Sequence, residues 1–422
     1  MNFKRISVVG LGYIGLPTAA MFASRKIEVI GLDVNPQTVD TINQGKIHIV
    51  EPDLEMLVHA AVKGGYLRAT LQAEPAQAFL IAVPTPLIGD YEPDLSYIHS
   101  AAKMIAPVLE RGNLVVLEST SPVGATEQLV QWLAELRTDL TFPQKEEVDI
   151  DINVAHCPER VLPGYVVREL LENDRVIGGM TPHCSERSVQ LYRCFVRGEC
   201  IVTNARTAEM AKLTENASRD VGIAFANELS LICDRLKIDV WELIALANRH
   251  PRVNILSPGP GVGGHCIAVD PWFIVSSAPE ESRLIHAARV INDEKPGWVV
   301  SKVRDQVANF VLANPERKAV EVTVACMGLA FKADIDDLRE SPAVGIANKL
   351  ADTLPCNLIV VEPYIKALPP SLKEKAQLVS VEEALDNADV VIILVDHAQF
   401  KKVKHIKFAG KRVIDTRGLL SK

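Results

Sequence analysis

A cysteine beside a glycine-rich segment is the residue of this sequence best suited to act as a nucleophile. Cys266 follows Ser257–Gly264, a run of glycines and prolines that must be a loop because it cannot form a regular helix or strand. Exposed backbone N–H groups and the neighbouring His265 would favour a thiolate at Cys266, and Asp270 lies four residues further on. The alternative interpretation is a small buried apolar side chain, which is the commoner fate of cysteine.

Three polar residues form a second candidate site, on a predicted helix. Lys212, Asn216 and Arg219 lie at i, i+4 and i+7 of a segment, residues 207–236, that has no proline and one glycine. At 100° per residue they fall within an arc of about 60°. A lysine on such a stripe can act as a base where partial burial or a neighbouring guanidinium favours loss of its proton. Spacing alone favours the alternative, a solvated polar face.

A glycine pattern near the N-terminus predicts a dinucleotide site. The apolar run Ile6–Val9 leads into Gly10, Gly12 and Gly15, spaced as G-x-G-x-x-G for a tight turn, close approach of a pyrophosphate and close helix packing. Asp33 ends the next apolar run, where a carboxylate would bind an adenosine ribose and repel a 2′-phosphate. NAD is therefore predicted rather than NADP. The alternative is a turn of the same fold that holds no cofactor.

The elements that must position these residues alternate between strands and helices at both ends of the chain. Such alternation predicts parallel sheets covered by helices. The middle holds the long helix, of about 42 Å, a second helix at 240–248 and helical sequence again around 281–292. We predict an α/β fold in which two Rossmann-like, doubly wound parallel-sheet domains are joined by a long central helix and a helical middle domain. The predicted strands are Ile6–Val9, Val29–Leu32, Phe79–Val83, Leu114–Leu117, Val320–Met327, Asn357–Val361 and Val390–Val395; the predicted domains are 1–200, 201–315 and 316–422.

Composition restricts the classes of partner. The 422 residues carry 45 basic and 53 acidic side chains, and only 5% are aromatic, so nucleic acids and anionic membranes are poor candidates. No two of the eight cysteines have CxxC spacing and no metal-ligand pattern occurs, so we predict no metal and free thiols in the cytoplasm. No run of 18 apolar residues is present, which argues against a membrane helix. The basic residues Lys4 and Arg5 before an apolar stretch imitate a signal peptide, but the glycine pattern explains that stretch better.

Taken together, these motifs resemble those of the UDP-glucose/GDP-mannose 6-dehydrogenase family over nearly the whole chain. The resemblance implies an enzyme that oxidises the C6 alcohol of a nucleotide sugar to a carboxylate with two NAD. It also implies that residues 1–200 bind NAD, that 201–315 contain the dimerisation surface and the cysteine loop, and that 316–422 bind the UDP-sugar. The segments that carry the resemblance are Gly10–Leu16, Pro84–Pro86, Glu118–Gly124, Cys157–Gly164, Glu209–Asn216, Gly263–Pro271, Gly328–Lys332 and Asp336–Pro342.

The same resemblance assigns roles to residues. Cys266 matches the nucleophile that captures the aldehyde, Lys212 the proton donor and acceptor, and Asn216 the amide that polarises the reacting oxygen. Asp270 and Glu159 match acids linked to proton transfer and thioester hydrolysis, and Thr120 falls beside the nicotinamide. The implied cofactor contacts are Gly10, Gly12, Tyr13, Ile14, Gly15, Asp33, Thr85, Thr126 and Arg339. The implied substrate contacts are Arg160, Val161, Lys212, Asn216, Arg219, His250, Arg252, Gly263, Phe331 and Lys332, and Arg339 also matches the C-terminal half of the nucleotide-sugar site.

Two departures set the expected substrate. Val269 stands where the UDP-glucose group typically has lysine, and residues 158–164 resemble the branch that acts on N-acetylhexosamines. Both departures argue against UDP-glucose but do not separate the N-acetylhexosamines. The resemblance itself implies UDP-N-acetyl-D-mannosamine, oxidised for bacterial surface polysaccharide, with UDP-GlcNAc and UDP-glucose as alternatives. A two-electron hydroxyacid-type dehydrogenase and an NAD-dependent sensor without turnover are alternatives of other classes. The long helix and the resemblance also predict a homodimer or higher homo-oligomer in which residues 250–252 reach into the neighbour's site.

Overall fold

The computed structural model describes residues 3–49, 51–144, 149–162, 164–264 and 266–420. The chain divides into two compact units. The first comprises the described residues of Met1–Glu215 and Trp272–Pro279, and the second those of Asn216–Pro271 and Glu280–Lys422. Each unit contains a parallel sheet of its own.

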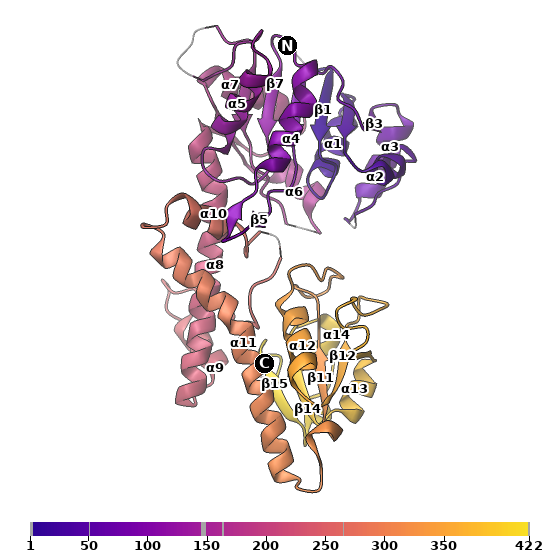
Figure 1. Cartoon of the computed structure of the whole chain (residues 1–422), viewed down its shortest axis with the longest axis vertical. Coiled ribbons are helices and arrows are strands. Elements are labelled where there is room, and N and C mark those ends of the chain that lie inside the picture. Colours follow the sequence, from indigo (N-terminus) through magenta and orange to yellow (C-terminus); the bar gives the residue numbers. More distant parts are fainter. Residues whose placement is uncertain (1–2, 50, 145–148, 163, 265, 421–422) are drawn as a thin grey trace. The chain divides into compact units, whose positions relative to one another are not determined.

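The sheet of the first unit reverses its strand order at β1, which lies between β2 and β4 (Figure 1). Neighbouring strands run parallel except for β8 and β9, which are antiparallel. Doubly wound sheets bind their ligands at the carboxyl ends of strands beside such a reversal. Within the described residues the order of the eight strands is β10 (Cys200–Asn204), β9 (Arg175–Gly179), β8 (Asn153–His156), β7 (Leu114–Leu117), β4 (Ala78–Ile81), β1 (Arg5–Val9), β2 (Glu28–Leu32) and β3 (Leu67–Thr70).

Helices and one small hairpin connect these strands. The hairpin consists of β5 (Leu87–Ile88) and β6 (Glu92–Pro93), and its Tyr91 ring stacks on Trp272 with ring centres 4.0 Å apart. The helices of this unit are α1 (Gly15–Ser24), α2 (Pro36–Asn43), α3 (Leu54–Lys63), α4 (Ser96–Ile105) with the 3₁₀ turn Ala106–Val108, α5 (Ala125–Leu136), α6 (Val166–Glu172) and α7 (Pro182–Tyr192), and most of α10 (Asp270–Ser277) also belongs to it.

Both faces of this sheet are buried. Successive residues of a strand point to opposite faces. In β7, Leu114 and Val116 join the apolar cluster that contains α1 and α3, whereas Val115 and Leu117 join the cluster that contains α4 and α5. Continuous apolar runs rather than alternating ones are therefore required in these strands, and such runs made them recognisable in the sequence.

The second unit has a smaller parallel sheet that also reverses at its first strand, β11. Val324 and Cys326 of β11 are buried against one helical layer, and Ala325 and Met327 against another. Within the described residues the strand order is β13 (Gln377–Leu378), β12 (Asn357–Val361), β11 (Thr323–Met327), β14 (Val390–Ile393) and β15 (Arg412–Asp415); the helices of this part are α12 (Pro342–Thr353), α13 (Val381–Asn387) and α14 (Ala398–Lys401), with 3₁₀ turns at Ala319–Glu321 and His405–Phe408.

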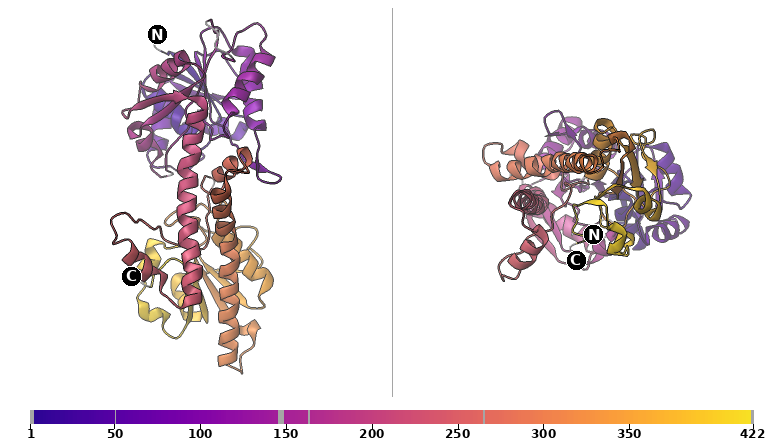
Figure 2. Two further views of the ribbon diagram at one scale, coloured as in Figure 1. Left: turned by 90° about the vertical axis from the view of Figure 1, so that its left-hand side faces the viewer. Right: turned by 90° about the horizontal axis from the view of Figure 1, so that it is seen from below.

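Long helices make up the middle of the chain. They are α8 (Ala205–Leu236), α9 (Val240–Ala247) and α11 (Arg283–Ala313), and the boundary between the units falls within α8. In the second unit α8 runs beside α11 (Figure 2), where Arg289 donates a hydrogen bond of 2.6 Å to Asp220. Both of these side chains are buried.

These sheets and helices confirm the predicted fold class. The helix expected around residues 281–292 differs, because α11 continues through Pro296 to Ala313. A proline inside a helix removes one hydrogen bond, but the residues after it bury an apolar face that includes Val299, Val300 and Val303. In the described part of the chain, no helix is long and apolar enough to cross a membrane.

Candidate active site

The turn between β1 and α1 has the geometry of a dinucleotide-binding turn. Gly10 has a φ of 88°, and a Cβ at Gly15 would lie 1.8 Å from the carbonyl oxygen of Gly10, so α1 can pack closely on the strand only without side chains here. A Cβ at Gly12 would meet nothing within 4 Å, so this residue borders open space. Tyr13 and Ile14 complete the turn, and no side chain caps the first turn of α1. The free N–H groups of a helix N-terminus are a site for a diphosphate, so these residues fit NAD.

Asp33, directly after β2, faces the same turn. Its Oδ2 accepts a hydrogen bond of 2.9 Å from the N–H of Leu11, and its Oδ1 accepts one of 2.9 Å from the N–H of Asn35. The carboxylate is partly exposed. Two ionised oxygens offer about four acceptor positions, so two remain for the hydroxyls of a ribose.

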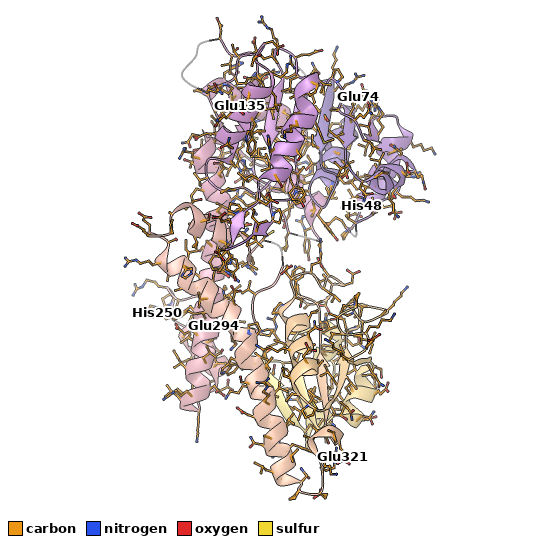
Figure 3. The ribbon with its side chains drawn as sticks, in the orientation of Figure 1. His48, Glu74, Glu135, His250, Glu294 and Glu321 are labelled. Carbon is orange, nitrogen blue, oxygen red and sulfur yellow. The ribbon has the colours of Figure 1, made fainter. Side chains whose placement is uncertain are left out.

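A hollow beside this acid was not apparent from the sequence. Burial lowers the pKa of His48, which is labelled in Figure 3, while the negative charge of the Asp33 carboxylate acts in the opposite direction. His48 belongs to the lining of a cavity of about 790 Å³. The lining residues are Ile47, His48, Ile49, Glu51, Pro52, Asp53, Glu55 and Met56.

The loops after β4 and β7 are tied together at the carboxyl edge of the sheet. The hydroxyl of Thr85 donates a hydrogen bond of 2.6 Å to the carbonyl oxygen of Thr120, and the hydroxyl of Ser119 donates one of 2.7 Å to that of Val83. Thr85 therefore holds the backbone of Thr120 in place. Contact of either hydroxyl with a cofactor stays a prediction.

Thr126 has a protein partner that the sequence did not indicate. Glu209 of α8 accepts hydrogen bonds from the N–H of Gly124 at 2.7 Å, from the N–H of Thr126 at 2.8 Å and from the hydroxyl of Thr126 at 2.6 Å. The carboxylate thus caps the start of α5 and orders the segment that follows Thr120. Because Thr126 is fully buried, its side chain supports this cap, and a direct contact with NAD stays a prediction.

Glu159 lies after β8 with its carboxylate held from two sides. Its Oε2 accepts a hydrogen bond of 2.9 Å from the Nη1 of Arg175, and its Oε1 accepts one of 2.8 Å from the N–H of Arg160. Glu159 and Arg175 are both buried. Arg160 forms an ion pair of 2.6 Å with Glu215 of α8, and the next residue, Val161, is half-buried.

A second buried carboxyl, that of Glu118, is affected by the charge of Glu159. Glu118, directly after β7, accepts a hydrogen bond of 2.6 Å at Oε1 from the hydroxyl of Tyr192. Burial raises the pKa of Glu118 to about 7, against the opposing charge of Arg175. Burial also raises the pKa of the Cys157 thiol to about 12, so this cysteine is not a candidate nucleophile.

The polar stripe of α8 divides between interior and surface. Lys212 is 9% exposed, Asn216 is half-buried and Arg219 is exposed. The structure brings Asn216 to Asp270, whose Oδ2 accepts a hydrogen bond of 2.5 Å from the Nδ2 of Asn216. Asp270 is buried at the start of α10. The solvated-face alternative therefore holds for Arg219 only.

The cysteine loop packs against the C-terminal sheet domain within the second unit. Residues 257–264 form no helix or strand, as predicted. A Cβ at Gly263 would lie 2.6 Å from the carbonyl oxygen of Glu340, and one at Gly264 would lie 3.2 Å from the ring of Phe331. Glycine is therefore needed at both positions for this close approach.

A buried amide anchors the other end of this loop. The N–H of Gly259 donates a hydrogen bond of 2.9 Å to the Oδ1 of Asn227 on α8, and Asn227 in turn donates to Asn292 on α11 at 2.9 Å. Cys266 is exposed after this anchored loop, as a nucleophile must be. His265 lies outside the described residues.

The remaining predicted substrate residues lie on exposed loops of the second unit. Phe331 is half-buried and Lys332 is exposed; Arg339 makes hydrogen bonds of 2.9 and 2.6 Å to the carboxylate of Asp337. His250 (Figure 3) and Arg252 are exposed in the segment after α9. In the part of the chain that the structure describes, no group of three or more His, Cys, Asp or Glu side chains could hold a metal ion.

Comparisons with known proteins cover the whole length. Residues 4–196, 206–294 and 325–422 match the NAD binding, central and UDP binding domains of the UDP-glucose/GDP-mannose dehydrogenase family. A UDP-N-acetyl-D-mannosamine dehydrogenase of Yersinia pestis is 63% identical, over 99% of this chain and 100% of the relative. An NDP-N-acetyl-D-galactosaminuronic acid dehydrogenase of Ralstonia solanacearum is 62% identical, over 100% of this chain and 97% of the relative.

Solved structures of similar proteins support the same family. A UDP-D-ManNAc dehydrogenase from Pyrococcus horikoshii superposes with a TM-score of 0.86 at 38% identity, covering 98% of this chain and 96% of its own. The dinucleotide turn, the exposed Cys266 after its anchored loop and three successive domain matches lead to one assignment. The chain belongs to the UDP-glucose/GDP-mannose dehydrogenase family, as its motifs predicted.

Proposed function

We propose that this enzyme oxidises UDP-N-acetyl-D-mannosamine at C6 to UDP-N-acetyl-D-mannosaminuronate in two steps, for bacterial surface polysaccharide. The observation that carries the proposal is the hydrogen bond from Asn216 to Asp270. It joins the helix that bears Lys212 to the segment that bears Cys266, four residues before Asp270. The two limits between the three predicted domains, at 200 and 315, are part of the proposal and are supported by domain matches at 4–196, 206–294 and 325–422.

NAD, when bound, accepts one hydride in each of the two oxidations. In the first, Lys212 takes the proton of the C6 hydroxyl while Asn216 holds the oxygen by its amide. A neutral aldehyde does not readily lose a second hydride, but its tetrahedral adduct with the Cys266 thiolate does, and becomes a thioester that water opens. Over both steps one alcohol, two NAD and one water give one carboxylate, two NADH and three protons.

Hydrolysis needs a base near the thioester, and we assign that role to Glu159 together with Asp270. Both are buried, and the guanidinium of Arg175 holds Glu159 in one orientation. A carboxylate paired with arginine can still accept a hydrogen bond from water on its other lone pairs. Thr120 lies beside the nicotinamide in this proposal, with its backbone held by Thr85.

The choice of sugar rests on similarity to relatives, because epimers differ only in the direction of one substituent. High identity to relatives named for UDP-N-acetyl-D-mannosamine supports that substrate. A relative of 62% identity named for NDP-N-acetyl-D-galactosaminuronic acid favours a second candidate, UDP-N-acetyl-D-galactosamine. Val269 and residues 158–164 argue against UDP-glucose.

The test is NADH yield on a panel of UDP-sugars, read at the NADH absorbance band. Incubation with limiting UDP-N-acetylmannosamine is expected to give two NADH per sugar, and UDP-glucose very little. Two NADH from UDP-N-acetyl-D-galactosamine alone would move the assignment to the second candidate. One NADH per sugar would indicate a two-electron dehydrogenase, and none a sensor.

We also propose a homodimer or higher homo-oligomer in the cytoplasm, where NAD and nucleotide sugars are found. Phe225, Ile232 and Leu236 are exposed on α8 and, at 100° per residue, fall within an arc of about 40°. Such an apolar stripe on a long helix is typical of a self-complementary interface. His250 and Arg252, exposed beyond the next helix, would then be available to the neighbouring site.

A further inference from the structure

The sheet of the second unit repeats the turn of the first. Gly328 directly follows β11 as Gly10 directly follows β1, and both glycines have positive φ, 95° and 88°. The N–H of each donates a hydrogen bond of 2.8 Å to the last residue of the neighbouring strand. Glu362, directly after β12, therefore occupies the place that Asp33 occupies after β2. In the first unit that place is the acceptor for a ribose.

Glu362 has a different environment from its counterpart. Its side chain is fully buried. Its Oε2 accepts hydrogen bonds from the N–H groups of Leu329 at 2.7 Å and Ala330 at 3.0 Å, and from the Nε2 of His397 at 3.0 Å. Its Oε1 accepts a fourth from the N–H of Tyr364 at 3.2 Å. Three donors saturate Oε2 and the side chain is fully buried, so Glu362 is not accessible to a ribose diol.

His397 extends this network to the far end of the turn. The side chain is fully buried. Its Nδ1 accepts a hydrogen bond of 2.9 Å from the N–H of Asp334, so the proton resides on Nε2, which donates to Glu362. The carboxylate of Asp334 accepts a hydrogen bond of 2.8 Å from the N–H of Ala398, directly after the histidine. Both ends of the segment 328–334 are thus bound to one buried pair.

Phe331 and Lys332 lie between these two ends. The ring of Phe331 also contacts Gly264 of the cysteine loop, so the position of this segment affects both the substrate and the nucleophile loop. We propose that Glu362 and His397 are positioning residues. Glu362 stands where the first unit has its ribose acceptor, but together with His397 it binds the backbone of segment 328–334. This buried pair, here called the clamp, holds Phe331 and Lys332 in position for the UDP part of the substrate. This rests on the proposed function.

Substitution at His397 tests the clamp. His397→Leu keeps the volume but removes the acceptor for Asp334 and the donor for Glu362. Buried donors and acceptors without partners are costly in free energy, so the segment 328–334 should shift to find other partners. We therefore expect the Kd for UDP, measured by calorimetry, and the KM for the UDP-sugar to rise about tenfold or more. The NADH Kd should change by less than about threefold, because the hydrogen bonds of Glu362 and His397 described above all lie within the second unit. The matched control is His405→Leu, an exposed histidine of the same domain, which should match the wild type.

Two milder variants separate positioning from general damage. His397→Asn keeps an acceptor for Asp334 and Glu362→Gln keeps an acceptor for Leu329, so each should show a smaller rise in the UDP Kd, with unchanged circular dichroism. Unchanged UDP affinity in His397→Leu and His397→Asn, or equal losses of UDP and NADH affinity, would overturn the clamp. A wild type that binds NADH but no UDP would instead overturn the proposed function on which the clamp rests.

Discussion

Asn216 donates a hydrogen bond of 2.5 Å to Asp270, across 54 residues of sequence. The pair combines a half-buried amide with a buried carboxylate, and Lys212 lies one helical turn before the amide. Removing the amide takes away the group that orients Asp270 and, in the proposed mechanism, a donor to the reacting oxygen. We expect Asn216→Ala to lower kcat by about 100-fold, the range of one acid–base contribution. Steady-state kinetics with NAD and UDP-sugar varied in turn measure this.

The control for that variant is Ser218→Ala, an exposed position of the same helix. It should leave kcat unchanged, and NADH affinity should be normal in both proteins. Asn216→Ala with wild-type kcat would remove the pair from the mechanism.

Asp33 should determine the choice of dinucleotide. Two of its acceptor positions are used by Leu11 and Asn35, and the rest are available to a ribose diol but repel a 2′-phosphate. Asp33→Ala should raise the KM for NAD by about tenfold, equivalent to about 1.4 kcal/mol. It should also reduce the preference of the enzyme for NAD over NADP. Asp40→Ala, an exposed acid on α2, is the control. Equal use of NADP by the wild type would show this interpretation of β2 to be wrong.

The apolar stripe of α8 should be an interface. Phe225→Asp combined with Ile232→Asp places charges on it, and burying an unpaired charge is costly. Light scattering should show at least twice the chain mass of 46.2 kDa for the wild type and 46.2 kDa for the double variant. Ile406→Asp, an exposed apolar position of the C-terminal domain, should not change the mass. A fully active wild-type monomer would contradict the interface.

Glu118 should make stability depend on pH. Its pKa is raised by burial from 4.5 to about 7, so between these values the unfolded chain loses a proton that the folded chain retains. The contribution of Glu118 to stability is thus fully present below 4.5 and is lost as pH rises through 7. The groups that face it are Arg175 of β9, Tyr192 of α7, and Cys157 and Glu159 after β8.

Glu118→Gln keeps the acceptor for Tyr192 and cannot ionise. From pH 5 to pH 8 the free energy of unfolding of the wild type should fall relative to this variant, by at most about 3 kcal/mol for a shift of this size. Urea titrations at each pH measure the difference, with Glu110→Gln, an exposed acid, as the control. A constant difference between wild type and Glu118→Gln would mean that Glu118 is ionised throughout.

The sequence predicted those parts of the molecule that depend on local pattern. The run Ile6–Val9, the glycines after it and Asp33 combine a buried strand, a turn and an acid within one short unit. The strand Leu114–Leu117 was predicted with its observed limits, because a continuous apolar run is what burial on both faces of a sheet requires. The long helix α11 was predicted only as far as about residue 292, because proline normally ends a helix and burial of the following turns cannot be read from spacing.

Long-range partners could not be predicted. Thr126 and Glu209 are 83 residues apart, and His397 and Glu362 are 35 apart on different loops. No local periodicity relates such pairs, since only the order of strands in the sheet brings them together. The site residues named from the resemblance stay predictions, whereas the groups that hold their surroundings in place, such as Arg175 and Asn227, emerged from the structure alone.

Product per active site in the Cys266→Ser enzyme tests the central claim, a covalent four-electron oxidation. The first hydride comes from an alcohol and needs no thiol, whereas the second needs an adduct, and an alkoxide is a poorer nucleophile and leaving group than a thiolate. Mass spectrometry of enzyme and products, with UDP-N-acetylmannosamine and excess NAD, should show an oxygen ester or aldehyde and at most about one acid per Cys266→Ser chain, against continuous turnover in the wild type. Sustained release of acid with two NADH per sugar by Cys266→Ser would contradict the account.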